Sequence, residues 1–164
     1  MAEQIFPTVL EILEEFGAEI VRDIGNSIKD KDLIASGNLS KQTSFDIKIQ
    51  LATQSYQFQL NMASYWEALD KGRKAGKQPP TKEIKKWLQQ PNVKSKFGME
   101  NSDLSLKTLK DYELNGLAYV IARKIGRDGT KATNFYSAVV TEQRINQLIA
   151  ELQEAAAVDL IAQF

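Results

Sequence analysis

The sequence contains no cysteine and no histidine. Without cysteine it has no disulfide framework, no thiolate nucleophile and no zinc site of the thiolate type. Without histidine it lacks the usual near-neutral general base and the commonest metal ligand. Carboxylate, lysine, tyrosine and serine chemistry stays open. We therefore expect no cofactor and no metal site, and we do not expect an enzyme.

Long apolar runs are missing as well. No run approaches the roughly 18 residues that span a bilayer, and Glu3 precedes a proline-interrupted amphipathic stretch instead of a signal peptide. We therefore expect no membrane contact and a protein made and kept in a cytoplasm. The formal net charge is zero, which argues against a wholly basic nucleic-acid coat or an acidic disordered tail.

The length of 164 residues suits one domain with one core. No internal repeat, low-complexity tract or linker divides the chain. Residues 1–164 are therefore predicted to form a single domain.

The first part of the chain carries a helical pattern followed by a strand pattern. Apolar residues recur at spacings of three and four from Phe6 to Ile28, which predicts a long amphipathic helix with Pro7 in its first turn. Gly17 is expected to mark a close contact. Alternating apolar residues over 43–51 and 56–62 then predict two strands joined as a hairpin. Because a lone hairpin is marginal in water, it must pack on the first helix, a further strand or a neighbouring subunit.

Residues 64–101 mix aromatic and polar segments. Residues 64–70 fit a short helix or a continuing strand, and 71–80 is predicted to be an exposed loop. Thr81 is expected to cap a helix that runs to Gln90, with Ile84, Trp87 and Leu88 facing inward. Residues 92–101 are predicted to form another polar loop.

Two more helices are predicted toward the C-terminus. The first starts at Leu104 or Leu109, faces inward with Leu114, Leu117, Ala118, Ile121 and Ile125, and stops at Gly126. Phe135 and Tyr136 are expected to anchor the polar segment 127–131 to the core. The last helix follows Thr141, with an apolar stripe of Ile145, Leu148, Ile149, Leu152, Ala156, Leu160 and Ile161. The fold class is α+β, with a long N-terminal helix, a small antiparallel sheet built on a hairpin, and C-terminal helices.

Charge is unevenly distributed along the chain. The region 71–96 holds nine lysines and arginines against Glu83, whereas the first helical region is mainly acidic. Opposite charges on separate surfaces suit head-to-tail contacts between identical subunits. A solvated charged loop beside a solvated helix explains the same pattern, and a nucleic-acid contact of the basic segment 71–96 is a third interpretation.

Two further groups of residues could carry a function. Tyr65 and Trp66 are either core residues or interface anchors, whereas Trp87 is expected in the core because of its helical spacing from Ile84. Asp46 and Lys48 share one strand face, as in a metal-dependent nuclease that also uses Glu67 or Asp32. Alternating strands often produce such a pair as surface decoration.

The order of features resembles the neck proteins of long-tailed bacteriophages, in particular the tail-completion or head-tail joining family. The resemblance covers residues 37–140. It is carried by Ser36-Gly37-Asn38-Leu39, the hairpin, Tyr65-Trp66-Glu67 with Gly72, Pro79-Pro80, the segment 117–125, and Gly129-Thr130 before Asn134-Phe135. Asn134 stands where the family often has proline, and the basic loop after Trp66 is longer than the family pattern.

The resemblance implies a structural virion protein at the head-tail junction. Such a protein forms a ring, expected to be a hexamer, that closes the tail tube and docks it to the head connector around a DNA channel. Its expected partners are copies of itself, the neighbouring connector and tail-tube proteins, and DNA in the channel. The expected contact residues are Tyr65, Trp66, Arg73, Lys74, Lys77, Arg127, Lys131 and Phe135. The alternatives are a nucleic-acid-binding protein or nuclease that uses segment 71–96, and a host-directed inhibitor encoded by a phage.

Overall fold

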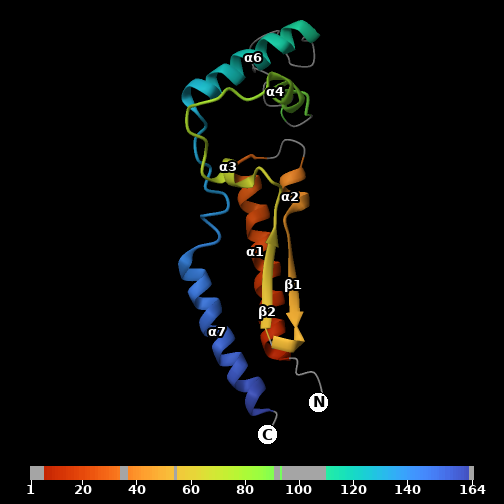
Figure 1. The fold of residues 1–164 in the computed structure, drawn as a ribbon, viewed down its shortest axis with the longest axis vertical. Helices are drawn as coiled ribbons and strands as arrows, with labels where there is room; N and C mark the ends of the chain where they lie inside the picture. Colours follow the sequence, from red (N-terminus) through yellow and green to blue (C-terminus); the bar gives the residue numbers. More distant parts are fainter. Residues whose placement is uncertain (1–5, 34–36, 54, 91–92, 94–109, 163–164) are drawn as a thin grey trace. The chain divides into compact units, whose positions relative to one another are not determined.

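The fold is seen in a computed structural model that describes residues 6–33, 37–53, 55–90, 93 and 110–162 (Figure 1). The chain divides into two compact units. Unit 1 comprises Met1–Lys31, Ser40–Ala63 and Phe135–Phe164, and unit 2 comprises Asp32–Leu39 and Ser64–Asn134. Each unit is assembled from separate stretches of the chain. For this reason no single linker divides the units, and the amino-acid composition does not mark their boundary. The single domain expected from the sequence stays a prediction.

Unit 1 contains the long first helix, the hairpin and the last helix. These elements are α1 (Pro7–Asp30), β1 (Ser44–Gln50), the 3-10 turn η1 (Leu51–Thr53), β2 (Ser55–Asn61) and α7 (Glu142–Ile161). The strands pair antiparallel, with Ile47 opposite Phe58. The mixed helix and strand architecture predicted from the sequence is confirmed, as are the first helix and both strands. A short helix, α2 (Asn38–Gln42), precedes β1 and was not predicted.

The hairpin packs on α1, which was the first of the three expected solutions. Phe58 stacks on Phe45 with ring centroids 5.7 Å apart and meets the edge of Phe16 on α1, also at 5.7 Å. Val9 and Leu13 of α1 join the same core. The expected close contact at Gly17 is confirmed, because a Cβ atom built there would lie 2.5 Å from the Phe45 ring. Gly17 therefore sets how closely the hairpin approaches the helix.

Replacing Gly17 with alanine is expected to lower the free energy of unfolding, although alanine is the better helix former. The new methyl group would displace the Phe45 ring, and overpacking of this kind costs about 1–3 kcal/mol. Gly25 on the same helix is the matched control, since a Cβ there meets nothing within 4 Å. Urea unfolding followed by circular dichroism measures both variants. Gly25→Ala should be neutral or stabilising, and equal losses for the two variants would contradict this role of Gly17.

Helix α7 packs on α1 and also caps its first turn. Phe6, at the N-cap of α1, provides no side-chain hydrogen bond. Instead, the buried Asp159 carboxylate of α7 accepts hydrogen bonds from the Thr8 amide at 3.0 Å, the Val9 amide at 3.2 Å and the Thr8 hydroxyl at 2.6 Å. The positive end of the α1 dipole also favours a carboxylate at this position. Asp159 thus fixes the last helix to the first across about 150 residues of sequence.

The described residues of unit 2 form the helices α3 (Trp66–Asp70), α4 (Thr81–Leu88) and α6 (Asp111–Asp128). Leu88, Val93, Leu114 and Ala118 form its buried core, with Ile84, Leu117 and Ile121 packed against them. An ion pair of 2.7 Å between Lys85 and Asp111 ties α4 to α6. Of the two options for residues 64–70, the helix is observed. Within the described residues, no helix is both long and apolar enough to cross a membrane.

Several details of the predicted helices in unit 2 are wrong. Pro80 is the N-cap of α4 and makes no side-chain cap, so Thr81 is the first helical residue instead of the cap. Trp87 is 39% exposed, because Leu88 supplies the inward face of that turn. Helix α6 passes through Gly126 and ends at Gly129, whose φ of 74° lies in the left-handed region. The starts proposed at Leu104 and Leu109 lie outside the described residues, as does the loop 92–101 except for the buried Val93.

The inward stripe predicted for the last helix is correct at only three of its seven residues. Leu148 is buried, Ile145 and Leu152 are partly buried, and Ala155, which was not predicted, is buried as well. The other predicted members are exposed: Ile149, Ala156, Leu160 and Ile161. The helix therefore has two apolar faces, and the continuation of the buried one passes through Ala155 to Asp159.

Candidate interaction site

Two polar segments that are distant in sequence lie side by side in unit 2. Arg73 and Thr130 exchange both backbone hydrogen bonds, at 3.0 and 2.8 Å, in an isolated antiparallel bridge. The Gly76 amide donates to the Gly126 carbonyl at 2.8 Å, and the Asn134 amide donates to the Asp70 carbonyl at 3.0 Å. Residues 70–78 and 126–134 thus form one paired structure, which we call the segment pair. The sequence predicted residues 71–80 only as a loop, because neither segment has a strand pattern.

Two glycines make this pairing possible. Gly72 has a φ of 73°, and a Cβ atom built there would lie 2.5 Å from the Thr130 carbonyl oxygen. A Cβ atom on Gly129 would overlap the carbonyl oxygen of Arg73. Both positions therefore need a left-handed backbone and the absence of a side chain. The sequence signal for them was a glycine beside a cluster of polar residues in each segment.

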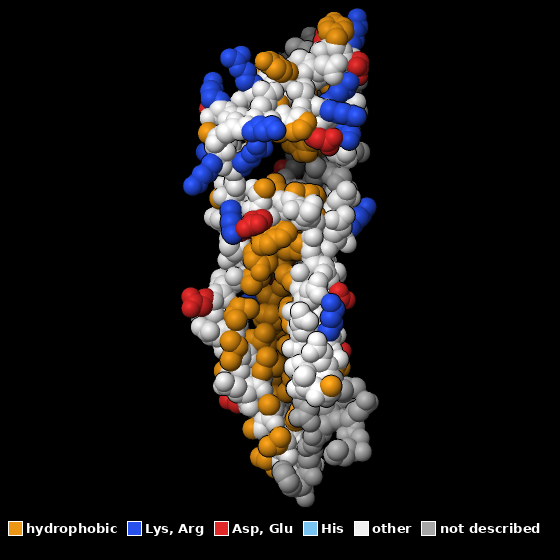
Figure 2. Space-filling view, viewed as in Figure 1, with side chains coloured by type: hydrophobic (Ala, Val, Ile, Leu, Met, Phe, Trp, Pro, Cys, Tyr) orange, Lys and Arg blue, Asp and Glu red, His pale blue; other side chains and the backbone are white. Residues whose placement is uncertain are grey.

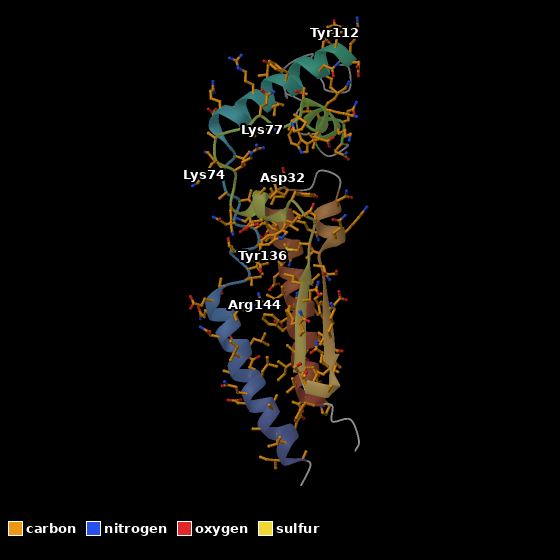
Figure 3. All side chains as sticks on the ribbon, in the orientation of Figure 1. Asp32, Lys74, Lys77, Tyr112, Tyr136 and Arg144 are labelled. Carbon is orange, nitrogen blue, oxygen red and sulfur yellow. The ribbon has the colours of Figure 1, made fainter. Side chains whose placement is uncertain are left out.

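The segment pair brings together five of the predicted contact residues: Arg73, Lys74, Lys77, Arg127 and Lys131. All five are exposed. Figure 3 labels Lys74 and Lys77 on this stretch of chain. The Arg73 guanidinium donates a short hydrogen bond to the carbonyl of Lys77, which folds the basic segment back on itself. The sequence did not reveal this cluster, because residues 71–78 and 126–131 lie far apart in the chain and each reads as a separate polar segment.

The cations of the segment pair differ in how they are neutralised. Arg127 makes two hydrogen bonds to Asp128, of 2.6 and 2.8 Å. Among the described residues, no aspartate or glutamate forms an ion pair with Lys74, Lys77 or Lys131. These three lysines are the charges most available to an anionic partner.

The Arg127–Asp128 pair gives a testable titration. The hydrogen bond from Arg127 lowers the pKa of the Asp128 carboxyl, with a smaller contribution from the charge of Lys124. Arg127→Gln should raise the pKa of Asp128 toward its usual value, and Lys124→Gln should raise it less. Carboxyl NMR titration measures both. Since the folded pKa is the lower one, the pair stabilises the fold above the unfolded pKa, and this stabilisation is lost as pH falls through the folded pKa. An unchanged Asp128 titration in Arg127→Gln would contradict the assignment.

The aromatic candidates fall into two groups. Tyr65 is about half exposed just before α3, its partial burial raises the pKa of its hydroxyl, and Trp66 begins the helix with intermediate exposure. Phe135 is fully buried. Phe135 therefore anchors the chain to the core, as expected from its place after the polar segment, and its assignment as a partner contact is wrong for this structure.

The residues of the predicted nuclease pattern make hydrogen bonds and ion pairs with ordinary neighbouring side chains. Asp46 and Lys48 do share the exposed face of β1. The Asn61 amide donates to Asp46 at 2.6 Å, Lys48 donates to Gln59 at 3.1 Å, and Glu67 is paired with Lys71 at 2.7 Å. In the part of the chain that the structure describes, no group of three or more aspartate or glutamate residues is placed to hold a metal ion.

A cleft of about 480 Å³ lies between α1 and α7 within unit 1. Arg144 occupies one side of it, with its guanidinium 2.8 Å from Asp23, 3.4 Å from Glu19 and 5.9 Å from the centre of the Phe16 ring. Glu151 and Leu148 complete part of the lining. Since Arg144 already pairs with two of the carboxylates, we attribute its main role to holding α7 against α1.

The two units carry opposite charge. Unit 1 contains twelve acidic and six basic residues, whereas unit 2 contains nine acidic and fifteen basic residues. Their formal net charges are therefore −6 and +6, although the whole chain is neutral. In Figure 2, most lysine and arginine side chains on the visible face lie over unit 2, and a band of hydrophobic side chains runs along unit 1 between β2 and α7. The charge separation seen along the sequence thus becomes a separation between structural units.

Comparison with known proteins gives no relative: no protein-family model, no curated protein and no solved structure matches the chain.

Proposed function

We propose that the chain is a structural protein of the bacteriophage neck, a ring-forming tail-completion or head-tail joining component. The observation that carries the proposal is the formal charge of −6 on unit 1 and +6 on unit 2. The resemblance of residues 37–140 to neck proteins supplies the particular setting. Copies of the chain are the first partners, in a ring expected to be a hexamer, followed by the connector and tail-tube proteins.

Head-to-tail assembly follows physically from two unlike surfaces on one chain. A contact between unit 1 of one copy and unit 2 of the next is heterologous, and repeating it gives a closed ring or an open filament. Opposite charges speed such an encounter and disfavour contacts between like units. Lys74, Lys77 and Lys131 fit this role because no described carboxylate of their own chain pairs with them.

The experiment is sedimentation velocity of the purified protein at about 0.05 M and about 0.5 M salt, where screening lengths differ several-fold. We expect oligomers at low salt that dissociate at high salt. Charge reversal in Lys74→Glu/Lys77→Glu should weaken assembly by about tenfold or more. Lys48→Glu is the control, since it reverses an exposed lysine of unit 1. A strict monomer under all these conditions contradicts the proposal.

A nucleic-acid-binding function would use the same lysines, and the same variants separate the two. Binding to phosphates weakens steeply with salt and is lost on charge reversal. If Lys74→Glu/Lys77→Glu abolished DNA retention at low salt while the protein remained monomeric throughout, the binding function would replace the assembly function.

A further inference from the structure

Helix α6 has a second face whose side chains are exposed and which the described residues of unit 2 leave uncovered. The residues on it, called the outer strip of α6, recur at spacings of three and four: Tyr112, Gly116, Tyr119, Val120, Arg123 and Arg127. The face lies opposite the buried Leu114, Ala118 and Ala122. Tyr112 is 67%, Tyr119 51% and Val120 61% exposed. Tyrosine is among the side chains that dominate the energetics of contacts between proteins, and this exposed face carries two of them beside an exposed valine.

Gly116, at the centre of this strip, has no packing contact with the described residues that would require a glycine. A Cβ atom built there meets nothing within 4 Å, and its backbone φ is not in the left-handed region. Glycine weakens a helix interior relative to alanine, so its place in the middle of α6 is unfavourable for the isolated chain. A glycine between Tyr112 and Tyr119 gives a second helix room to approach the backbone.

Helix α7 in unit 1 also has an exposed face that is mainly apolar. The outer strip of α7 consists of Ile149, Ala156, Leu160 and Ile161, which the sequence placed inside, together with Ala150 and Ala157; the exposed Gln153 lies among them. Ile149 is 47% and Ile161 73% exposed, whereas Leu148 and Ala155 on the opposite face are buried against α1. A helix that is apolar on two faces is normally covered on both.

We propose that the outer strip of α6 in one copy packs on the outer strip of α7 in a second copy. The alanines of α7 give the two tyrosines of α6 a flat apolar surface, and Gly116 allows the two helices a close approach. Charges agree as well: Arg123 of the α6 strip has no carboxylate partner among the described residues, while Glu142 and Glu154 of α7 are exposed and do not line the cleft toward α1. This inference rests on the proposed function and identifies the surface through which the copies join.

The absence of cysteine gives a direct test. Gly116→Cys and Ala157→Cys are made as separate single variants of the full chain and mixed under oxidising conditions. In the mixture, a disulfide between the two strips can form only between copies, so a non-reducing gel should show a linked dimer. We expect several-fold more of this dimer in the mixture than in either variant alone. Ala52→Cys, an exposed position outside both strips and outside the segment pair, replaces Gly116→Cys in the control mixture and should give little dimer.

The outcomes distinguish the surface from the function. A dimer as abundant in one single-variant sample as in the mixture means that like strips meet, and this overturns the inference. No cross-link in the mixture, with wild-type protein that still assembles, also overturns it and leaves the proposed function standing. Wild-type protein that never assembles removes both.

A second variant tests the strip without cysteine. Tyr119→Asp should weaken assembly by about ten- to a hundredfold, the loss typical of a central aromatic contact, with an unchanged unfolding temperature. Gln57→Asp adds the same charge at an exposed position of β2, outside both helices, and should leave assembly unchanged. Equal assembly of the two variants would contradict the proposal. If Tyr119→Asp abolished DNA retention and left assembly intact, the strip would belong to a nucleic-acid contact instead.

Discussion

Gly129→Ala is expected to disrupt the segment pair and to lower the free energy of unfolding by roughly 3 kcal/mol, since backbone strain and overpacking add at this position. Gly129 ends α6 with φ 74° and ψ −161°, a region essentially restricted to glycine. The new Cβ atom would also overlap the Arg73 carbonyl oxygen. Urea unfolding gives the loss in free energy. Amide hydrogen exchange at Arg73 and Thr130 reports the bridge itself.

Gly76→Ala is the matched control in the same structure. A Cβ atom at Gly76 meets nothing within 4 Å, and its φ is not positive. We expect this variant to unfold like the wild type and to keep the Arg73 and Thr130 amides protected. If Gly129→Ala kept the same stability and the same amide protection, this would contradict the close approach of residues 70–78 to residues 126–134.

Asp159→Ala is expected to have a comparable effect in unit 1. The substitution leaves the Thr8 and Val9 amides and the Thr8 hydroxyl without their acceptor at the first turn of α1. Losing a buried, charged cap should cost about 2–4 kcal/mol. Asp159→Asn keeps one acceptor oxygen without the charge, so its loss should be intermediate. Denaturant unfolding measures the three proteins.

Glu154→Ala is the control for Asp159→Ala. Glu154 is an exposed carboxylate on the same helix and should change stability by no more than about 0.5 kcal/mol. A loss in Asp159→Ala as small as that would mean that α7 does not depend on this cap.

Local patterns predicted the elements of the fold well, because helix and strand periodicity report burial directly. The stripe of α1 and the alternation of Ile47 and Phe58 gave the right elements, and the observed packing on α1 is one of the three solutions that the sequence left open. Features set by tertiary contacts were not visible. Asp159 caps a helix that begins about 150 residues earlier, and Gly129 rather than Gly126 ends α6 because it is the one that meets Arg73.

The sequence identified the basic residues of the candidate site, but it did not predict how they are arranged in space. The basic residues of 71–77 and 127–131 were identified separately, and the backbone bridge that joins them has no sequence signature. The apolar stripe of α7 was treated as one face, although Leu148 lies inside and Ile149 outside. Exposure distinguishes them only when the position of α1 is known. The outer strip of α6 was missed because its tyrosines follow the same helical period as the core residues.

The proposal of repeated contact between copies of the chain rests on the opposite charges of the two units and on the exposed outer strips of α6 and α7. The proposed place of that assembly is the neck of a phage particle. The most direct measurement is antibody labelling and electron microscopy of purified phage particles from cells that make the protein. We predict label at the head-tail junction. Absence of the protein from complete particles, or label elsewhere on them, would contradict the proposal.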